Sequence, residues 1–241
     1  MSFLSGKNAK VLSDVTDLSA YLNAVDTTQD AALLETTTFG ATGKTYLMGF
    51  KNGTASLKGF WDGAVAAVDA VLAAALGSAG GEIVTIAPDG LTVGKRLYLL
   101  LSRLTKYGVS TPVDGVVAIT ADMQADGGID YGVSLHALAE ETATGSGASV
   151  DNAASSANGG VAHLHVSAVT AVGGDTLDVV VQHSTNGSTW VDLITFAQLT
   201  TATTKERLTV AGTVNRYVRA NWTKGGAGTP SYTFAVAFAR R

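Results

Sequence analysis

Short apolar runs separated by turn dipeptides dominate this chain of 241 residues. Aspartate or asparagine followed by glycine recurs between the runs, and these dipeptides favour the turns that connect neighbouring strands. In the first half, we expect strands at 81–86, 95–106, 116–123 and 132–138. In the second half, we expect strands at 162–166, 176–183, 190–196, 206–210, 216–223 and 232–239. The pattern therefore predicts a mainly β protein.

The strongest local hairpin prediction falls within residues 45–58. Asn52-Gly53 stands there between two apolar segments. A type I′ turn needs positive φ at both central positions, and Asn-Gly adopts that conformation readily. We therefore expect two short strands joined at Asn52-Gly53.

One segment has helical rather than β periodicity. In the alanine-rich run 64–76, apolar residues recur at the spacing of one helix face, namely Val65, Val68, Leu72 and Leu76. Asp62 is placed to cap the start of this helix, and Gly77 is placed to end it. The first half is thus expected to be a β barrel or sandwich with one α-helix.

Composition and charge both change along the chain. Residues 142–160 consist almost wholly of Gly, Ala, Ser, Thr, Asn and Asp, which predicts a flexible linker because such residues cannot pack a core. Residues 1–145 carry nine basic and fifteen acidic residues, whereas 146–241 carry seven and five. The expected organisation is a β barrel or sandwich domain over 1–141, the linker over 142–160, and a small β-sandwich over 161–241.

Composition also excludes several functional classes. A net charge of −4 argues against a protein that wraps nucleic acid through many phosphate contacts. The chain has no cysteine, which removes disulfides, thiolate nucleophiles and cysteine-based metal sites. The apolar run 64–76 contains Asp69 and is shorter than the roughly 20 residues that a membrane span needs. No secretory signal is expected at the N-terminus.

Residues 40–45, Gly-Ala-Thr-Gly-Lys-Thr, end like a phosphate-binding loop. Such a loop requires a glycine five positions before the glycine of its Gly-Lys pair. That position is Thr38, and the following residues are expected to form a strand rather than a helix. A turn that feeds a hairpin is therefore the favoured interpretation.

His163 and His165 alternate on one expected strand and therefore share a face, as a pair of metal ligands would. His183 or Asp178 is a conceivable third ligand, but an ordinary polar strand face explains the spacing without a metal. No serine lies in a Gly-x-Ser-x-Gly motif. We predict no catalytic, metal-binding or cofactor-binding residue.

Residues 17–63 carry a series of recognisable motifs. They are Asp-Leu-Ser-x-Tyr-Leu, Glu-Thr-Thr-Thr-Phe-Gly, a Gly-x-x-x-Gly-Thr segment followed by Leu57 and Gly59, and a closing Phe-Trp-Asp-Gly. This series resembles the opening of the major tail tube proteins of long-tailed bacteriophages. Residues 116–138 look like the closing strands of the same family, so the resemblance covers roughly 1–140.

The resemblance implies a structural protein rather than an enzyme. Six copies would form a ring in which sheets join edge to edge, and stacked rings would form a tube that conducts DNA during ejection. Implied partners are further copies of the chain, the tape measure and terminator proteins, and DNA that passes without sequence-specific binding. The implied location is the virion tail, after synthesis in the host cytoplasm. A related injection-system tube stays open as an alternative.

By the same resemblance, ring-stacking contacts fall within 36–58, with Phe39, Gly40, Phe50, Asn52 and Gly53 as candidates. The alternative is that both phenylalanines fill the core. The acidic first half suits a channel that does not hold DNA. The acidic residues that could line such a channel are Asp14, Asp17, Asp26, Asp30, Asp122, Asp126 and Asp130.

The second half resembles a different kind of module. Residues 181–190 and 216–219 look like two strands of discoidin-like β-sandwiches, although Asn186 replaces the usual aspartate. A smaller immunoglobulin-like decoration is the alternative, and either module is expected to project outward. Trp190 is expected in its core. Trp222 is expected in the core or at its rim, or exposed as a candidate glycan contact. A carbohydrate-binding adhesion module that binds host surface glycans is accordingly the alternative function.

Overall fold

The computed structural model describes residues 5–241, which form a mainly β protein with one α-helix. Its strands belong to two antiparallel sheets, of which the second is smaller, so the predicted fold class is confirmed. The chain divides into two compact units. Unit 1 contains the segment up to Ala20 together with 83–99 and 130–241, and unit 2 contains 21–82 and 100–129.

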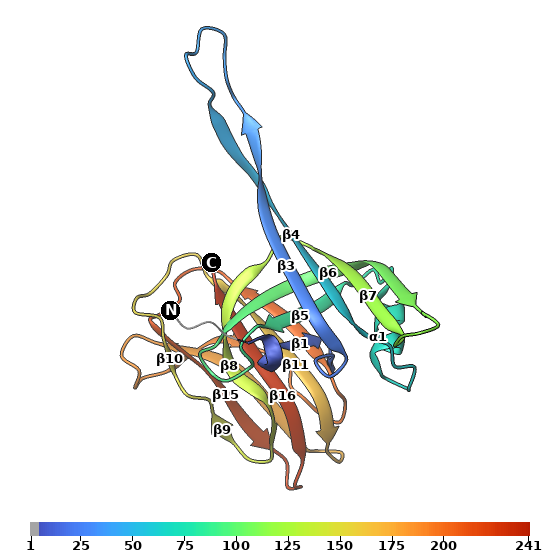
Figure 1. The fold of residues 1–241 in the computed structure, drawn as a ribbon. Helices are drawn as coiled ribbons and strands as arrows, with labels where there is room; N and C mark the ends of the chain where they lie inside the picture. The colour runs from blue at the N-terminus through green and yellow to red at the C-terminus, as the bar shows by residue number, and fades with distance from the viewer. Residues whose placement is uncertain (1–4) are drawn as a thin grey trace. The chain divides into compact units, whose positions relative to one another are not determined.

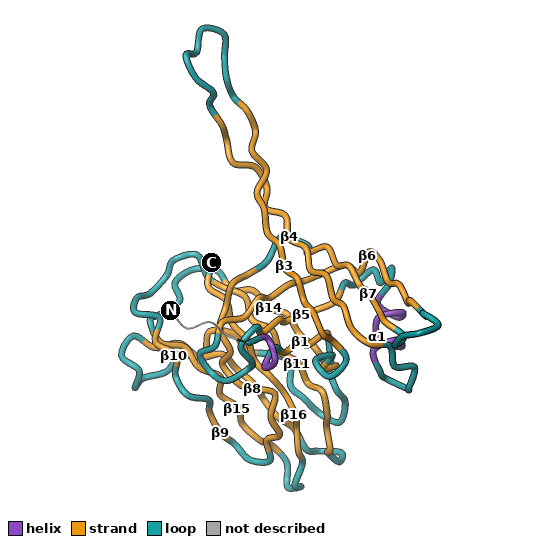
Figure 2. The backbone as a smooth tube through the Cα atoms, in the orientation of Figure 1, coloured by secondary structure: helices purple, strands orange, loops and turns teal. Residues whose placement is uncertain are grey.

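The larger sheet of unit 1 is assembled from distant parts of the chain. Its strands are β1 (Lys10–Ser13), β2 (Thr16–Asp17), β5 (Glu82–Ala87), the first residues of β6 (Arg96–Ser110), β8 (Asp130–Glu141), β11 (Gly160–Thr170), β14 (Lys205–Val210) and β16 (Ser231–Arg240). Their order is β14-β11-β16-β8-β6-β5-β1-β2. A short 3-10 helix, Gly6–Asn8, precedes β1. Strands that are far apart in the sequence therefore lie side by side, as Figures 1 and 2 show.

The smaller sheet covers one face of the larger one within unit 1. It contains β9 (Gly145–Ser146), β10 (Val150–Asp151), β12 (Thr176–Ser184), β13 (Val191–Thr195) and β15 (Tyr217–Gly225). Alternate residues of β12 point inward, so that Leu177, Val179 and Val181 are buried. The two sheets form a sandwich whose core includes residues from β8, β11, β12, β15 and β16.

Strand β16 is buried on both of its faces. Phe234, Val236 and Phe238 belong to the core between the two sheets. The intervening alanines 235, 237 and 239 belong to a second cluster that also contains Leu97 and Leu99. A strand covered on both sides is expected to be apolar without interruption, and this explains the run Phe-Ala-Val-Ala-Phe-Ala near the C-terminus.

The strands predicted in the second half agree with those observed. The predicted turn at Asn186-Gly187 is also present, and Gly187 has φ +73 there. Residues 142–160 contain β9 and β10, and both of these short strands pair with β15. The division into 1–141, 142–160 and 161–241 stays a prediction. The compact units have the different bounds given above.

Unit 2 contains four strands of the larger sheet, namely β3, β4, β7 and the part of β6 from Leu100 onward, together with the α-helix. Strand β4 (Tyr46–Phe60) pairs with β3 (Leu22–Glu35) on one side and β7 (Ala118–Ala125) on the other, and β7 also pairs with β6. Every second residue of β4 from Gly53 to Gly59 is buried. Inward-facing residues of β7, such as Ile119 and Met123, are buried with them.

The prediction of a hairpin turn at Asn52-Gly53 is wrong. Both residues lie inside β4, opposite Asp30 and Gln29 of β3. A Cβ at Gly53 would lie 2.8 Å from Cγ1 of Ile129, so the glycine is needed for close packing and not for a turn. The turn lies instead between β3 and β4, over residues 36–45.

The predicted helix is present but shorter than expected. α1 spans Val68–Ala75, and its buried residues are Val68, Leu72 and Ala75. Ala66 has φ +61, which a right-handed helix does not tolerate, so residues 64–67 stay outside. Consequently Val65 is exposed rather than part of the apolar face.

The helix ends only partly follow the sequence prediction. Asp62 accepts a hydrogen bond from the backbone N–H of Ala64 at 2.9 Å, and the residue at the N-cap position is Ala67, which makes no side-chain bond to the helix. Gly77 lies just beyond the C-terminal end with φ +77, as its predicted role requires. No helix within residues 5–241 is long and apolar enough to span a membrane.

Replacing Gly59 tests how closely β4 is packed. A Cβ at Gly59 would lie 2.2 Å from the carbonyl oxygen of Tyr21, which also accepts a hydrogen bond from the N–H of Phe60. We expect Gly59→Ala to lower the free energy of unfolding by about 3 kcal/mol, as over-packing does. Gly43→Ala is the control, because nothing lies within 4 Å of a Cβ there. Equal urea midpoints for the two variants would contradict the prediction.

Candidate self-association site

The β3–β4 hairpin extends well beyond the sheet that contains its base. β7 pairs with β4 only over residues 54–60, whereas β3 pairs with β4 from Gly59 to Tyr46. Within residues 5–241, the outer part is therefore a two-stranded ribbon with no third strand beside it. We call residues 31–51 the arm. It is about 30 Å long at the usual rise of a strand, and Figure 1 shows it projecting beyond the ends of β6 and β7.

The arm carries an unusual number of exposed apolar side chains. They are Leu33, Leu34, Phe39, Tyr46, Leu47, Met48 and Phe50. Phe39 and Phe50 are 110% and 93% exposed, so the alternative that they fill the core is wrong. Burying a side chain of this size contributes about 1.5–3 kcal/mol. The arm thus has the character of a surface that is covered in an assembly.

The tip of the arm is held by polar contacts within the hairpin. Lys44 forms an ion pair with Glu35 at 3.2 Å, and the hydroxyls of Thr36 and Thr45 lie 3.2 Å apart. The residues of the Gly-Ala-Thr-Gly-Lys-Thr motif are all exposed here. No helix follows the motif, so it has no phosphate-binding geometry.

The five candidate contact residues do not lie together. Phe39 and Gly40 lie at the tip, and Phe50 lies where the register between β3 and β4 shifts by one residue. Asn52 and Gly53 lie at the root, where the Asn52 side chain accepts a hydrogen bond from Gln124 at 2.6 Å and Gly53 is buried. The structure thus places three of the candidates on the arm and two in the sheet. Their role in ring stacking stays a prediction.

A second group of exposed apolar side chains lies at the opposite end of β4. It is formed by Phe60, Trp61, Val65, Val109, Val113 and Val116, which we call the base patch. Phe60 pairs with Ala118 and Val109 pairs with Ile119, while the N–H of Trp61 donates to Val117 at 3.0 Å. These contacts bring the ends of β4, β6 and β7 together. Unit 2 therefore exposes apolar surface at both ends of the same strand.

Most of the acidic residues considered for a channel are paired with basic side chains. Ion pairs join Asp17 to Lys10, Asp26 to Lys58, Asp122 to Lys106, Asp126 to Arg103, Asp14 to Lys205, and Asp130 to both Arg207 and Arg241. Such pairing reduces the field that the acidic excess would otherwise produce.

His163 and His165 do share a strand face, but that face is buried. Both rings contact the hydroxyl of Thr85, at 3.1 Å from Nδ1 of His163 and 2.8 Å from Nε2 of His165. Nδ1 of His165 donates to the carbonyl oxygen of Asp14 at 2.6 Å. Both nitrogens of His165 are therefore engaged. Within residues 5–241, no group of three or more potential ligands is placed to hold a metal ion.

The two tryptophans of the second half lie in different environments. Trp222 is only 4% exposed, contacts the rings of His136 and Phe234, and donates its indole N–H to Ala143 at 3.0 Å. Its assignment as an exposed glycan contact is therefore wrong, and its core position is confirmed. Trp190 is half-buried under the guanidinium of Arg219, 4.3 Å from the ring centre, rather than in the core.

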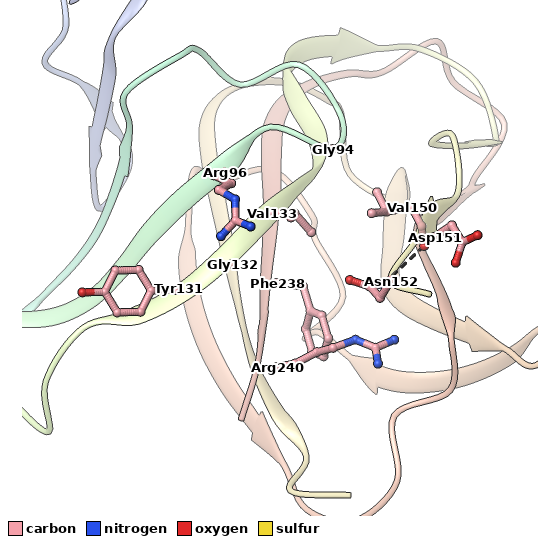
Figure 3. A pocket seen from close by; sticks show the side chains of 10 residues that line it. All are labelled: Gly94, Arg96, Tyr131, Gly132, Val133, Val150, Asp151, Asn152, Phe238 and Arg240. Carbon is pink, nitrogen blue, oxygen red and sulfur yellow. Dashed lines mark hydrogen bonds between the residues drawn. The ribbon is translucent and has the colours of Figure 1, made fainter. Parts of the chain in front are cut away.

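An open pocket of about 460 Å³ lies in unit 1, lined among others by Arg96, Tyr131, Asp151 and Arg240 (Figure 3). Its charged groups are mostly committed to structural contacts. The guanidinium of Arg240 donates to four backbone carbonyls, and the carboxylate of Asp151 accepts two bonds from Arg216. The hydrogen bond of Arg216 holds the pKa of Asp151 at about 2. We assign no reaction to this pocket.

No protein-family model matches the chain, and no curated protein matches it significantly. Solved structures give weak matches. A gene transfer agent virion protein is 15% identical, with a TM-score of 0.44 over 54% of this chain and 98% of that one. The SPP1 tail tube protein is 11% identical, with a TM-score of 0.45 over 53% of this chain and 78% of that one. SPP1 Dit, described as a hub of the adsorption apparatus, is 13% identical, with a TM-score of 0.38 over 96% of this chain and 98% of that one. At these values the matches carry no argument about function.

The buried histidines make the stability of the fold dependent on pH. Burial lowers the pKa of His165 to about 4. The pKa of His163 is well below its usual range, mainly because the ring is buried and secondly because of the charge of His165. The unfolded chain therefore binds more protons below pH 6.5. We expect full stability above that pH and a loss of about 3 kcal/mol from His165 as the pH falls to 4.

Urea unfolding at pH 7, 6, 5 and 4.5 measures this effect. The pKa of Asp151 in the folded state is about 2, so Asp151 reduces stability mainly below its ordinary value of 3.8 and contributes little between pH 7 and 4.5. A His165→Asn variant cannot take up the proton and should show a shallower slope. The same slope in both proteins would contradict the assignment to His165.

Proposed function

We propose that this chain is the structural subunit of a phage tail tube that assembles by self-association through the arm. The observation that carries the proposal is the arm itself. A two-stranded ribbon is at best marginally stable in water unless further strands or other surfaces cover it, and this one exposes seven large apolar side chains. The resemblance of residues 17–63 to tail tube proteins supports the same conclusion.

The positions of the two apolar surfaces favour an assembly that propagates. The arm and the base patch lie at opposite ends of β4, whose fifteen residues extend about 50 Å. The two surfaces are different, so an arm bound to the base patch of another copy forms a heterologous contact. Each such contact leaves one free arm and one free base patch. Stacked rings are the expected product when the copies also close laterally.

The finer parts of the proposal come from the sequence resemblance. They are six copies per ring, a channel that conducts DNA during ejection, contact with tape measure and terminator proteins, and location in the virion tail. Ion pairing of the acidic residues is compatible with a wall that neither attracts nor strongly repels phosphate. The role is structural and requires no catalytic residue. The alternative function as a carbohydrate-binding adhesion module is not supported by its candidate glycan contact, because Trp222 is buried.

Electron microscopy of the purified full chain tests the proposal. We expect negatively stained rings or tubes, and we expect Phe39→Ser combined with Phe50→Ser to reduce stacking at least tenfold at equal concentration. The matched control combines Val172→Ser with Val191→Ser, because these residues are also exposed but lie in unit 1, outside the arm. Sedimentation velocity gives the mass distribution of each variant.

Three outcomes decide between the alternatives. Loss of stacking in the arm variant alone supports the proposal. Equal stacking in both variants would exclude Phe39 and Phe50 as contacts. A chain that stays monomeric across salt and protein concentrations would contradict self-assembly altogether.

A further inference from the structure

The arm exposes apolar side chains on both of its faces. In an antiparallel pair, residues directly opposite each other point to the same face, and the face alternates along each strand. Leu33 lies opposite Met48, and Leu34 lies opposite Leu47. The first pair therefore occupies one face of the ribbon, and the second pair occupies the other.

The two faces are exposed to a similar extent. Leu33 and Met48 are 62% and 66% exposed, while Leu34 and Leu47 are 53% and 59% exposed. Tyr46, opposite Glu35, adds to the first face, and Ala32 packs against Gly49 on the second. A hairpin that lies flat on one partner normally keeps its outer face polar. Here neither face is suited to permanent contact with water.

We propose that the arm enters between two further copies of this chain, each of which covers one face. This inference rests on the proposed function, because it takes the occupants to be copies of the same subunit. The base patch supplies apolar surface on such copies. Within one chain it lies at the end of β4 opposite to the arm. Only three charged residues, Glu35, Lys44 and Lys51, lie in the arm, and the first two pair with each other.

The area of the ribbon also favours coverage of both of its faces. A two-stranded ribbon about 10 Å wide and about 30 Å long presents roughly 300 Å² on each face. A stable interface buries about 800 Å² on each partner. One covered face supplies less than half of that area, whereas both faces and the tip together come closer to it.

The consequence is a link between closure of a ring and stacking of rings. An arm held between two adjacent copies needs both of them in place before it is fully covered. A ring that is still incomplete would offer only one half of the receiving site. Stacking would then follow ring closure, and each arm would fix the spacing of two subunits in the next ring.

Single cysteines test the inference cleanly, because the chain has no cysteine of its own. Leu33→Cys and Leu34→Cys place one thiol on each face of the arm. Alkylation by a maleimide is followed in assembled tubes and in the same protein dissociated into monomers. We expect at least a tenfold slower reaction at both positions in the tubes. Exposed positions in a folded monomer should react at similar rates.

Paired serine substitutions provide a second readout that does not depend on labelling. Leu33→Ser with Met48→Ser changes one face, and Leu34→Ser with Leu47→Ser changes the other. We expect each pair to reduce stacking at least tenfold, with unchanged urea midpoints for the monomer because the four residues are exposed. The two pairs remove similar apolar area and serve as controls for each other.

The outcomes separate this inference from the proposed function. Protection of only one thiol, with only one serine pair impairing assembly, would overturn the two-sided arm and leave the tail tube proposal intact. Tubes in which both thiols stay reactive would overturn any buried role of the arm. No assembly by the unsubstituted chain would overturn the proposed function, and the inference with it.

Discussion

The rest of unit 2 depends on the hydrogen-bonding ladder of β4, which changes from two-sided to one-sided near Thr54. From Thr54 to Phe60 the strand has β7 on one side and β3 on the other, and its inward residues are buried. Towards Tyr46 only β3 remains, and nearly every side chain is exposed. The same strand is thus part of a core at one end and of an unsupported ribbon at the other. An apolar ribbon of this kind is stabilised only by further surface, and we propose that other copies supply it.

Unit 1 differs from unit 2, because its central strand β16 is covered on both faces. Phe234, Val236 and Phe238 fill the space between the two sheets, while the alternating alanines permit close contact on the other face. The buried chain of His163, Thr85 and His165 satisfies most of its polar atoms internally. This unit therefore has a core of its own between its two sheets. Unit 2, by contrast, leaves large apolar surfaces exposed at both ends of β4.

Particular residues show where sequence patterns were sufficient and where they failed. Alternation and apolar runs located the strands of the second half, because burial on one or both faces of a strand leaves a direct pattern. Asn52-Gly53 was misleading, since the glycine serves close packing against Ile129 rather than a turn. The helix prediction was too long because Ala66 adopts a positive φ that no periodicity reveals. Leu33-Leu34 and the apolar residues 46–50 could have indicated the arm, but an apolar strand in the sequence looks the same whether its partner is internal or another molecule.

The sequence by itself determined the β-rich class, the single helix, the lack of cysteine chemistry and the resemblance of residues 17–63 to tail tube proteins. These properties follow from local conformational preference and from composition. Only the tertiary structure decided that Trp222 is buried, that the two histidines share one buried hydroxyl, and that Phe39 and Phe50 face solvent on a projecting arm. Burial depends on which distant strands become neighbours, and the pairing of β8 with β16 or of β3 with β4 is a property of the folded chain as a whole.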